Sequence, residues 1–471
     1  SGFSASSNMT VYGSSSADVM NLNMDRSSDL TGNLTIALGA GNDSILSARL
    51  KDSDSIDMGA GDDTLYVMIG GSNGTPTLSA ANISKLDGGA GMDLIAFTES
   101  TGSNGQTLTL TTAGAVNFEN LLGSAYQETL QGDAGDNWIA GDRGVDTLYG
   151  NAGNDRLAAG SYSIFSYDDD DAFDVSSILN SVNDTNNNDN DVLYGGAGND
   201  SLYGSTGDNT LDGGTGTDTI WSGTGSDTIV IRSGDGSTTL ANADVLRDFS
   251  DGNDVIGMDS VSFDDLTIAQ GTGDYASHTL ITLTSSGEYL LIVQNVTASN
   301  ITAPDFASTS TSSQSFTGDS NNNTFIGGAG NDTFSGSSGS DALYGHGGDD
   351  SFTVSGKSGS YTDVIDGGSG TDTLTISYTG VTSLADLTFS TDGDYIVLTD
   401  SNGGAVKYKG IETLKVGSYT YTENTSDDTY WSSSTYALHM YDGGNTDSSA
   451  LTSLSGFSAS SNMTVYGSSS A

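Results

Sequence analysis

The sequence contains no cysteine and only 2 prolines in 471 residues. Without cysteine, the chain can form neither a disulfide framework nor a thiolate-bound zinc site. It also lacks any apolar run near the ~18 residues of a membrane span, and residues 1–10 have neither the basic start nor the apolar core of a signal peptide. We expect no direct membrane insertion, and we expect any secretion signal of the parent protein to lie outside this sequence.

Basic residues are also scarce. The chain has 12 Lys and Arg against 61 Asp and Glu, which gives a formal net charge of −49. Such a charge repels nucleic acid and anionic membrane surfaces and attracts cations. High charge with only 34% apolar residues is also typical of disordered chains. The ordered repeats described below favour a folded chain that binds cations and has no nucleic-acid partner.

Glycine, by contrast, is abundant, with 65 residues. An apolar content of 34% is low for the thick core of a large globular protein, but it suits a thin repeat solenoid. No segment shows sustained helical periodicity, and the apolar residues stand in short runs typical of strands. The composition therefore predicts an all-β repeat structure.

The first seventeen residues, SGFSASSNMTVYGSSSA, return unchanged as residues 455–471. The copies begin at Ser1 and Ser455, so the period is 454 residues. A convergent short motif would not preserve every residue. Either the parent protein repeats a unit of 454 residues or the ends were duplicated artificially, and we interpret the identity as natural tandem repetition.

A second repeat has nine residues and runs in phase through three parts of the chain. The first run starts at Gly123 with GSAYQETLQ, GDAGDNWIA, GDRGVDTLY and GNAGNDRLA. The second extends from Asn186 to Val230 and includes GGAGNDSLY and GGTGTDTIW. The third starts at Gly318 with GDSNNNTFI and GGAGNDTFS. Isolated copies begin at Leu38, Met58, Gly88 and Gly367.

These blocks resemble the RTX nonapeptide G-G-x-G-x-D-x-U-x, in which U is a large apolar residue. Several in-phase copies in each run make the signature strong. The resemblance implies a parallel β-roll, in which two nonapeptides form one turn and calcium ions lie between turns. Together with the long period, it points to the giant tandem-repeat surface or filament proteins of this kind, and so to an extracellular, bacterial location.

The residue types of the nonapeptide suit a metal-binding loop. Glycine at positions one, two and four permits positive φ, so six residues can turn tightly with their carbonyl oxygens directed at one point. An acidic residue at position six adds a hard anionic ligand, and calcium prefers six to eight oxygen ligands. Each strand buries one large side chain, worth roughly 2 kcal/mol, which is less than the backbone entropy of nine ordered residues. We therefore expect bound calcium to contribute much of the stability.

A turn of eighteen residues aligns position six of alternate nonapeptides. Seven pairs follow: 128 with 146, 137 with 155, 191 with 209, 200 with 218, 209 with 227, 323 with 341 and 332 with 350. Three positions carry Asn in place of a carboxylate, and their sites should bind calcium less tightly. The candidate calcium ligands in the runs are Glu128, Asn137, Asp146, Asp155, Asp191, Asp200, Asn209, Asp218, Asp227, Asn323, Asp332, Asp341 and Asp350.

Five further candidate ligands stand outside the continuous runs. Their neighbours are out of register with the eighteen-residue turn, so an ordinary Asx-turn explains them as well as calcium does. They are Asp18, Asp43, Asp63, Asp93 and Asp372.

The sequences between the runs suggest how the chain is divided into domains. We predict an irregular β-solenoid over residues 1–122, a β-roll over 123–230 with an inserted loop at 161–185, and a non-roll β cap or spacer over 231–306. A Ser/Thr-rich linker at 307–317, a second roll over 318–377, a β segment over 378–454 and the start of the next unit at 455–471 complete the prediction. In the inserted loop, the acidic run 168–171 favours a surface excursion over an extra cation site.

Two segments of the unit look like internal duplicates. Residues 88–122 and 367–415 each start as a nonapeptide, widen into longer strands and close on F/I-E-N/T-L, at Phe118–Leu121 and Ile411–Leu414. The likeness suggests internal duplication within the 454-residue unit.

No catalytic constellation stands out. The histidines His278, His346 and His439 stand alone, without the spacing of a zinc protease. We expect no enzymatic activity. The favoured function is a calcium-dependent extracellular structural protein, the unit of a filament, sheath or surface layer that forms a homopolymer through end-to-end or lateral contacts. The alternatives are a stalk repeat of a secreted RTX adhesin and an accessory RTX domain of a secreted enzyme.

Overall fold

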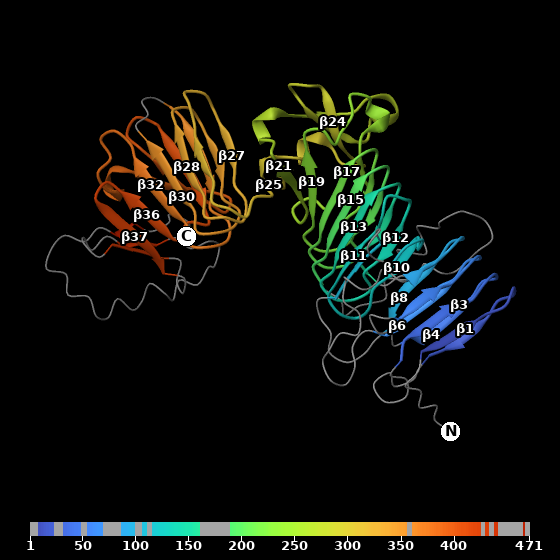
Figure 1. Ribbon diagram of the computed structural model, residues 1–471. Helices are drawn as coiled ribbons and strands as arrows, with labels where there is room; N and C mark the ends of the chain where they lie inside the picture. Colours follow the sequence, from blue (N-terminus) through green and yellow to red (C-terminus); the bar gives the residue numbers. More distant parts are fainter. Residues whose placement is uncertain are drawn as a thin grey trace. The chain divides into compact units, whose positions relative to one another are not determined.

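The computed structural model describes residues 8–22, 32–48, 54–68, 86–98, 106–110, 115–160, 189–355, 360–424, 429–432, 438–440 and 465–466. The chain forms two compact units, residues 1–256 with 267–301, and residues 257–266 with 302–471. In each unit, strands one turn apart pair in parallel and stack as successive rungs (Figure 1). The predicted fold class, an all-β parallel roll, is confirmed. No helix in the described part of the chain is long and apolar enough to span a membrane.

In its described residues, the first unit contains three sheets, in which most strands follow one another turn by turn. One sheet comprises β1 (Met9–Tyr12), β3 (Leu34–Ala37), β5 (Ser55–Asp57) and β7 (Leu86–Asp87). The second comprises β2 (Val19–Asn21), β4 (Ser44–Ala48), β6 (Thr64–Met68), β8 (Leu94–Thr98), β10 (Asn120–Leu122), β12 (Trp138–Ala140), β14 (Arg156–Ala158), β16 (Ser201–Tyr203), β18 (Thr219–Trp221), β20 (Val245–Leu246), β24 (Glu288–Val293), β23 (Thr279–Leu283) and β22 (Leu266–Gln270). The third runs through β9 (Gln106–Thr109), β11 (Glu128–Gln131), β13 (Thr147–Ala152), β15 (Val192–Ala197), β17 (Thr210–Thr215) and β19 (Thr228–Arg232), and the chain passes between the units within β21 (Val255–Asp259).

The eighteen-residue turn sets the register of the roll. Leu193 pairs with Leu211 and Leu211 with Ile229, and all three side chains are fully buried. Side chains alternate between the two faces of a strand, so the apolar residue of each x-U-x strand points inward and its neighbours point outward. In the short strands of the first roll the core is therefore a single column of large side chains, whereas a longer strand such as Ser351–Ser355 buries two, Phe352 and Val354.

The insertion between the first two runs leaves this register intact. Leu148 pairs with Leu193 and Leu157 with Leu202, each 45 residues further along the chain. The predicted loop at 161–185 lies outside the described residues, but its flanking strands continue both sheets. The inserted segment therefore replaces no turn of the roll.

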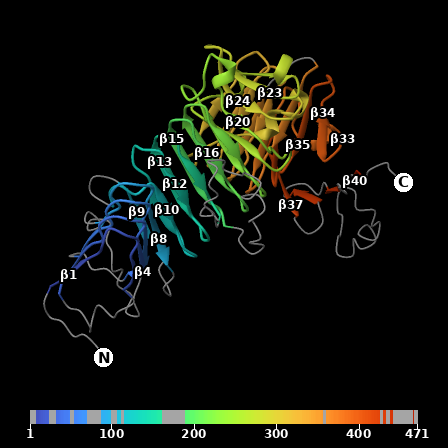
Figure 2. The same cartoon turned by 90° about the vertical axis from the view of Figure 1, so that its right-hand side faces the viewer.

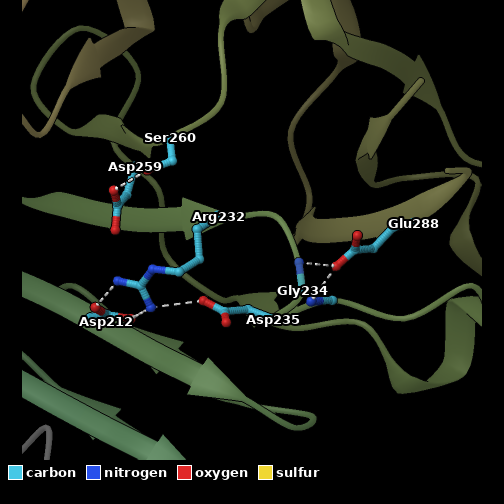
Figure 3. A network of polar contacts seen from close by, with 8 residues as sticks. Asp212, Arg232, Gly234, Asp235, Asp259, Ser260 and Glu288 are labelled. Atoms are coloured by element: carbon cyan, nitrogen blue, oxygen red, sulfur yellow. Dashed lines mark hydrogen bonds and ion pairs between the residues drawn. The ribbon is translucent and has the colours of Figure 1, made fainter. Parts of the chain in front are cut away.

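The first roll ends in an antiparallel segment. β20 pairs in parallel with β24, and β23 then pairs antiparallel with β24 (Figure 2). Beside it, the guanidinium of Arg232 binds both carboxylate oxygens of Asp212 and also Asp235 at 2.8 Å, while Glu288 accepts the N–H groups of Gly234 and Gly236 (Figure 3). This network fixes the chain where it leaves β19.

The second unit contains two sheets. The first comprises β26 (Ser315–Thr317), β28 (Thr333–Ser337), β30 (Ser351–Ser355), β32 (Thr373–Ser377), β36 (Thr413–Val416), β37 (Tyr419–Asn424), β38 (Thr429–Ser432), β39 (Leu438–Met440) and β40 (Val465–Tyr466). The second comprises β27 (Thr324–Ile326), β29 (Ala342–Tyr344), β31 (Thr362–Asp366), β35 (Ala405–Lys409), β34 (Tyr395–Thr399) and β33 (Thr388–Asp392). The short strand β25 (Phe306–Ser308) precedes them, and the 3₁₀ turns of the chain are η1 (Leu240–Asn242), η2 (Phe263–Asp265), η3 (Gly273–Tyr275), η4 (Ala298–Asn300), η5 (Ala303–Asp305) and η6 (Leu384–Asp386).

The predicted linker at 307–317 is wrong, because this segment forms the first turn of the second roll. Phe316 in β26 pairs with Phe334 in β28, and their rings stack at 4.9 Å. The backbone N–H of Gln314 donates to Asp332 Oδ1 at 2.6 Å. Serine is as common in tight turns as in linkers, since its hydroxyl can bond nearby backbone groups, so composition alone did not separate the two. The other predicted domain boundaries stay predictions, and residues 455–471 lie outside the described part except for β40.

Candidate metal sites

Position six of the nonapeptides forms a column that we call the carboxylate ladder. In each of the seven predicted pairs, the backbone N–H of the earlier residue donates to the side-chain Oδ1 of the later one, at 2.6 to 3.0 Å. The loops of successive turns are thereby locked together. Along each roll the ladder has two columns, one at the start of the strands of each of its two main sheets.

The isolated candidates are out of register with the eighteen-residue turn, as expected, but they take part in the same ladder. The backbone N–H of Asp18 donates to Oδ1 of Asp43, and that of Asp43 donates to Oδ1 of Asp63, both at 2.7 Å. The backbone N–H of Asp63 donates to Oδ1 of Asp93 at 2.8 Å. Turns here span 25, 20 and 30 residues instead of eighteen. The extra residues extend the turn without shifting the strands, because only the loop and strand positions must align. Asp350 donates in the same way to Asp372 at 2.7 Å.

Several ladder members were missed because no glycine-rich loop precedes them in the expected pattern. All but Gln314 accept a backbone N–H from the preceding turn, as the predicted members do, whereas Gln314 donates its own N–H to Asp332 of the next turn. A recognisable signal exists, since nearly all are acidic and stand two residues before a buried Leu or Ile. The missed members are Asp54, Glu119, Asp244, Asp254, Gln314, Asp363 and Glu412.

The two closing motifs of the similar segments hold equivalent places in the ladder. Glu119 Oε2 accepts the N–H of Asp93 at 2.8 Å, and Glu412 Oε2 accepts that of Asp372 at 2.6 Å. Phe118 and Ile411, which precede them, are both buried. In each case the longer Glu side chain continues the ladder.

The second oxygen of ten ladder carboxylates is buried without a hydrogen-bond partner in the described part of the chain. A buried charged oxygen without a partner costs free energy, so its presence in a native fold requires an explanation. A cation beside each oxygen would supply the missing partner. The ten oxygens are Oδ2 of Asp43, Asp63, Asp93, Asp146, Asp155, Asp200, Asp218, Asp227, Asp350 and Asp372.

The electrostatics of the ladder point the same way. Burial raises the pKa of Asp146 to about 9 and the pKa values of Asp155, Asp200 and Asp218 to about 7. The N–H donated to each carboxylate lowers its pKa, but desolvation outweighs this, and neighbouring acidic groups raise it further. The fold therefore holds negative charge that only a proton or a cation can neutralise.

Comparison with known families gives the identity of these loops. The RTX calcium-binding nonapeptide repeat, a model of four copies, matches residues 122–157, 185–220, 194–229, 203–236, 317–352 and 358–375. This chain carries RTX repeats. No curated protein matches the chain. RTX repeats bind multiple calcium ions, and proteins that carry these repeats are typically secreted.

The RTX loops fit calcium by their chemistry. Among the described residues, no three His, Cys, Asp or Glu side chains converge on one point. A calcium ion between loops would therefore take no more than two of these side chains and complete its six to eight ligands with other oxygens, such as backbone carbonyls. The ladder carboxylates with a buried second oxygen are the residues that would hold it. Bound calcium supplies a positive charge that offsets the desolvation of these groups.

Asn209 shows what replaces the cation where the RTX loop has a neutral side chain. Its Oδ1 accepts the N–H of Asp191 at 2.9 Å, as a ladder carboxylate would. Its Nδ2 donates to the carbonyl oxygens of Gly204 and Gly207 at 2.8 and 3.0 Å. These carbonyls belong to positions one and four of the same loop. The amide thus occupies the place at which the loop gathers oxygen atoms, in keeping with weaker calcium binding there.

At Gly150, which is position one of its nonapeptide, glycine is required by the approach of the ladder carboxylate. A Cβ on Gly150 would lie 2.3 Å from Asp155 Oδ2 and 2.5 Å from the carbonyl oxygen of Gly195. Gly198, at position four, has a φ of +138° and would place a Cβ 1.6 Å from the carbonyl oxygen of Gly153. These two glycines therefore leave no room for a side chain.

A second, exposed ladder runs through position five of the RTX loops. Asn154 donates its N–H to Asp136 Oδ1 at 2.7 Å, Asn199 donates to Asn154 at 2.9 Å, and Thr217 donates to Asn199 at 2.9 Å. The side chain of an Asn or Asp at position five accepts the backbone N–H of the next turn. Thr217, the last residue of this series, only donates its N–H. In the sequence, this second ladder is visible as Asn or Asp at position five, which the RTX motif leaves variable.

Proposed function

We propose that this chain is an extracellular structural protein of bacteria, the repeat unit of a calcium-dependent filament, sheath or surface layer, without enzymatic activity. The observation that carries the proposal is the identity of residues 1–17 with residues 455–471. A period of 454 residues built from parallel solenoids makes a long, one-dimensional array. Homopolymeric contacts along or between such arrays would give an extended material.

Calcium would couple folding to export. With a net charge of −49 and buried carboxylates, the chain is held open by charge repulsion where calcium is scarce. Outside the cell, calcium near ~10⁻³ M is enough to fill sites of the affinity found in extracellular modules. Folding then occurs after secretion.

Two other functions use the same fold. A stalk repeat of an adhesin would extend a binding domain from the cell, and an accessory domain would support a secreted enzyme. An enzyme accessory domain has no need to recur with a period of 454 residues, which favours the two array functions. The stalk differs from the polymer in lacking contacts between arrays.

Electron microscopy of negatively stained tandem chains of one, two and four units in calcium distinguishes these functions. Fibres or sheets support the structural polymer. Isolated rods whose length scales with the number of units would contradict the structural polymer and support the adhesin stalk. Hydrolysis of protein or polysaccharide by the purified unit contradicts a non-enzymatic role.

A further inference from the structure

The first turn of the first unit has an open end. Among the described strands, β1 (Figure 1) and β2 are terminal in their sheets, each paired on one side only. Tyr12 in β1 is 79% exposed and Val19 in β2 is 74% exposed, the two highest values among large apolar side chains in the described residues. Exposed apolar groups on unpaired edge strands are the surface that proteins normally cover.

The core beneath this end is also incompletely covered. Leu34 and Ile36 in β3 are 1% exposed, whereas Met9 and Val11, which pair with them from β1, are only half-buried. Terminal turns of a solenoid normally end in a cap with a polar outer face. β1 carries no such outer face, so its unpaired edge suits another strand.

The free edge of β1 has identifiable donors. The N–H groups of Met9 and Gly13 donate to the carbonyls of Asn33 and Ala37 on the side of β3, at 2.9 and 2.8 Å. In a parallel strand, successive N–H groups point to opposite sides. The N–H groups of Thr10 and Tyr12 therefore face away from β3.

The same residues occur a second time, paired with a different strand. Val465 and Tyr466 of β40 repeat Val11 and Tyr12 at the period of 454 residues. β40 pairs in parallel with β39, Val465 with Leu438 and Tyr466 with His439. One sequence thus pairs with β3 in its first copy and with β39 in its second.

From these pairings we infer that consecutive units are joined by a continuous sheet, in which the strand MTVY pairs at once with β39 of one unit and with β3 of the next. This inference rests on the proposed tandem array and names the contact within it. In the present chain, β40 covers β39 and leaves the edge of β1 open. The partner that fits this edge is β39 of another copy of the chain.

A variant of the full chain tests the seam. Thr464→Pro removes the backbone N–H that corresponds to Thr10 and weakens the pairing of β40 with β39. The freed β39 should then capture β1 of another chain, so sedimentation velocity in calcium should show association of Thr464→Pro chains at concentrations where the parent chain is monomeric. Adding Thr10→Pro to the same chain should weaken this association about tenfold or more, because proline blocks the free edge of β1.

Two further variants keep the test independent of folding. Val19→Lys, on a side chain that is already 74% exposed, should reduce the association without changing the calcium-induced circular dichroism of the chain. Val145→Lys, on an apolar side chain 44% exposed within the roll, is the matched control and should leave association unchanged. The seam is overturned if Thr464→Pro chains stay monomeric, or if they associate equally with Thr10→Pro or Val19→Lys present. Fibres that form despite these changes would retain the structural polymer and reject the seam alone.

Discussion

The backbone N–H of Asp200 donates to Oδ1 of Asp218 at 2.8 Å, while Oδ2 of Asp218 is buried without a hydrogen-bond partner in the described part of the chain. The two oxygens of one carboxylate thus have different roles. Oδ1 fixes the spacing of successive turns, and Oδ2 faces the loop of its own nonapeptide, where a Cβ on Gly213 would meet it at 2.4 Å. The same division recurs along both rolls.

Asp218→Asn separates these two roles. The amide oxygen can still accept the N–H of Asp200, but the amide nitrogen replaces the charged Oδ2. We expect calcium affinity at this site to fall about tenfold or more, since ligand charge governs affinity. Isothermal titration calorimetry of the full chain measures it. Asp208→Asn is the control, because Asp208 lies on the exposed ladder and accepts the N–H of Ser226 through Oδ1. Equal losses in the two variants would show that the effect is only one of net charge.

Asn209→Asp should have the opposite effect. The substitution removes the amide that donates to Gly204 and Gly207 and supplies a carboxylate at the same place. We expect the chain to bind one additional calcium ion, or to bind at this turn about tenfold more tightly. Equilibrium dialysis with calcium-45 gives the stoichiometry, and Asn199→Asp, on the exposed ladder, adds the same charge as a control. Unchanged binding in Asn209→Asp would contradict the assignment of the loop carbonyls to calcium.

Acid should partly replace calcium. Burial raises the pKa of Asp146 to about 9 and of Asp218 to about 7, whereas the unfolded chain loses these protons near pH 4. Between these values the folded chain binds more protons than the unfolded chain, so without calcium the free energy of unfolding falls as the pH rises from about 4 to 7. Circular dichroism in chelator should therefore show more β structure at pH 5 than at pH 8. A chelated chain that gains β structure as the pH rises would contradict the buried charges.

Arg232→Ala should destabilise the end of the first roll. The side chain of Asp212 is 7% exposed and that of Arg232 is 29% exposed, so removing the guanidinium leaves a nearly buried carboxylate unpaired. We expect a loss of about 2 kcal/mol in the free energy of unfolding in saturating calcium, measured with urea. Lys407→Ala breaks a pair whose partner Asp392 is 69% exposed, and it should cost less than about 1 kcal/mol. Similar costs for both would mean that the Arg232 network contributes no more than a surface pair.

Much of the ladder could be predicted from spacing alone. Asp200 and Asp218 stand eighteen residues apart in unbroken nonapeptides, so the turn length fixed their pairing. Asp63 and Asp93 could not be paired this way, because the turn between them has 30 residues and only the strands show where it closes. Asp244 and Glu412 follow loops without the glycine pattern, although the Leu that stands two residues later marks the strand.

The caps and the segment at 307–317 needed three-dimensional information. The antiparallel pairing of β23 with β24 depends on contacts between segments that carry no repeat. The Ser-rich segment before Phe316 has the composition of a linker. It forms a turn because β26, which follows it, pairs with β28 of the second roll. Local composition alone does not show which strands a segment will pair with.

Circular dichroism of the full chain during a calcium titration, started in chelator at neutral pH, tests the central claim most directly. The buried carboxylates predict a coil that changes cooperatively to β structure as calcium is added, and that loses this structure when chelator is restored. A chain that keeps its full β content in chelator at neutral pH would show that calcium does not hold the ladder together.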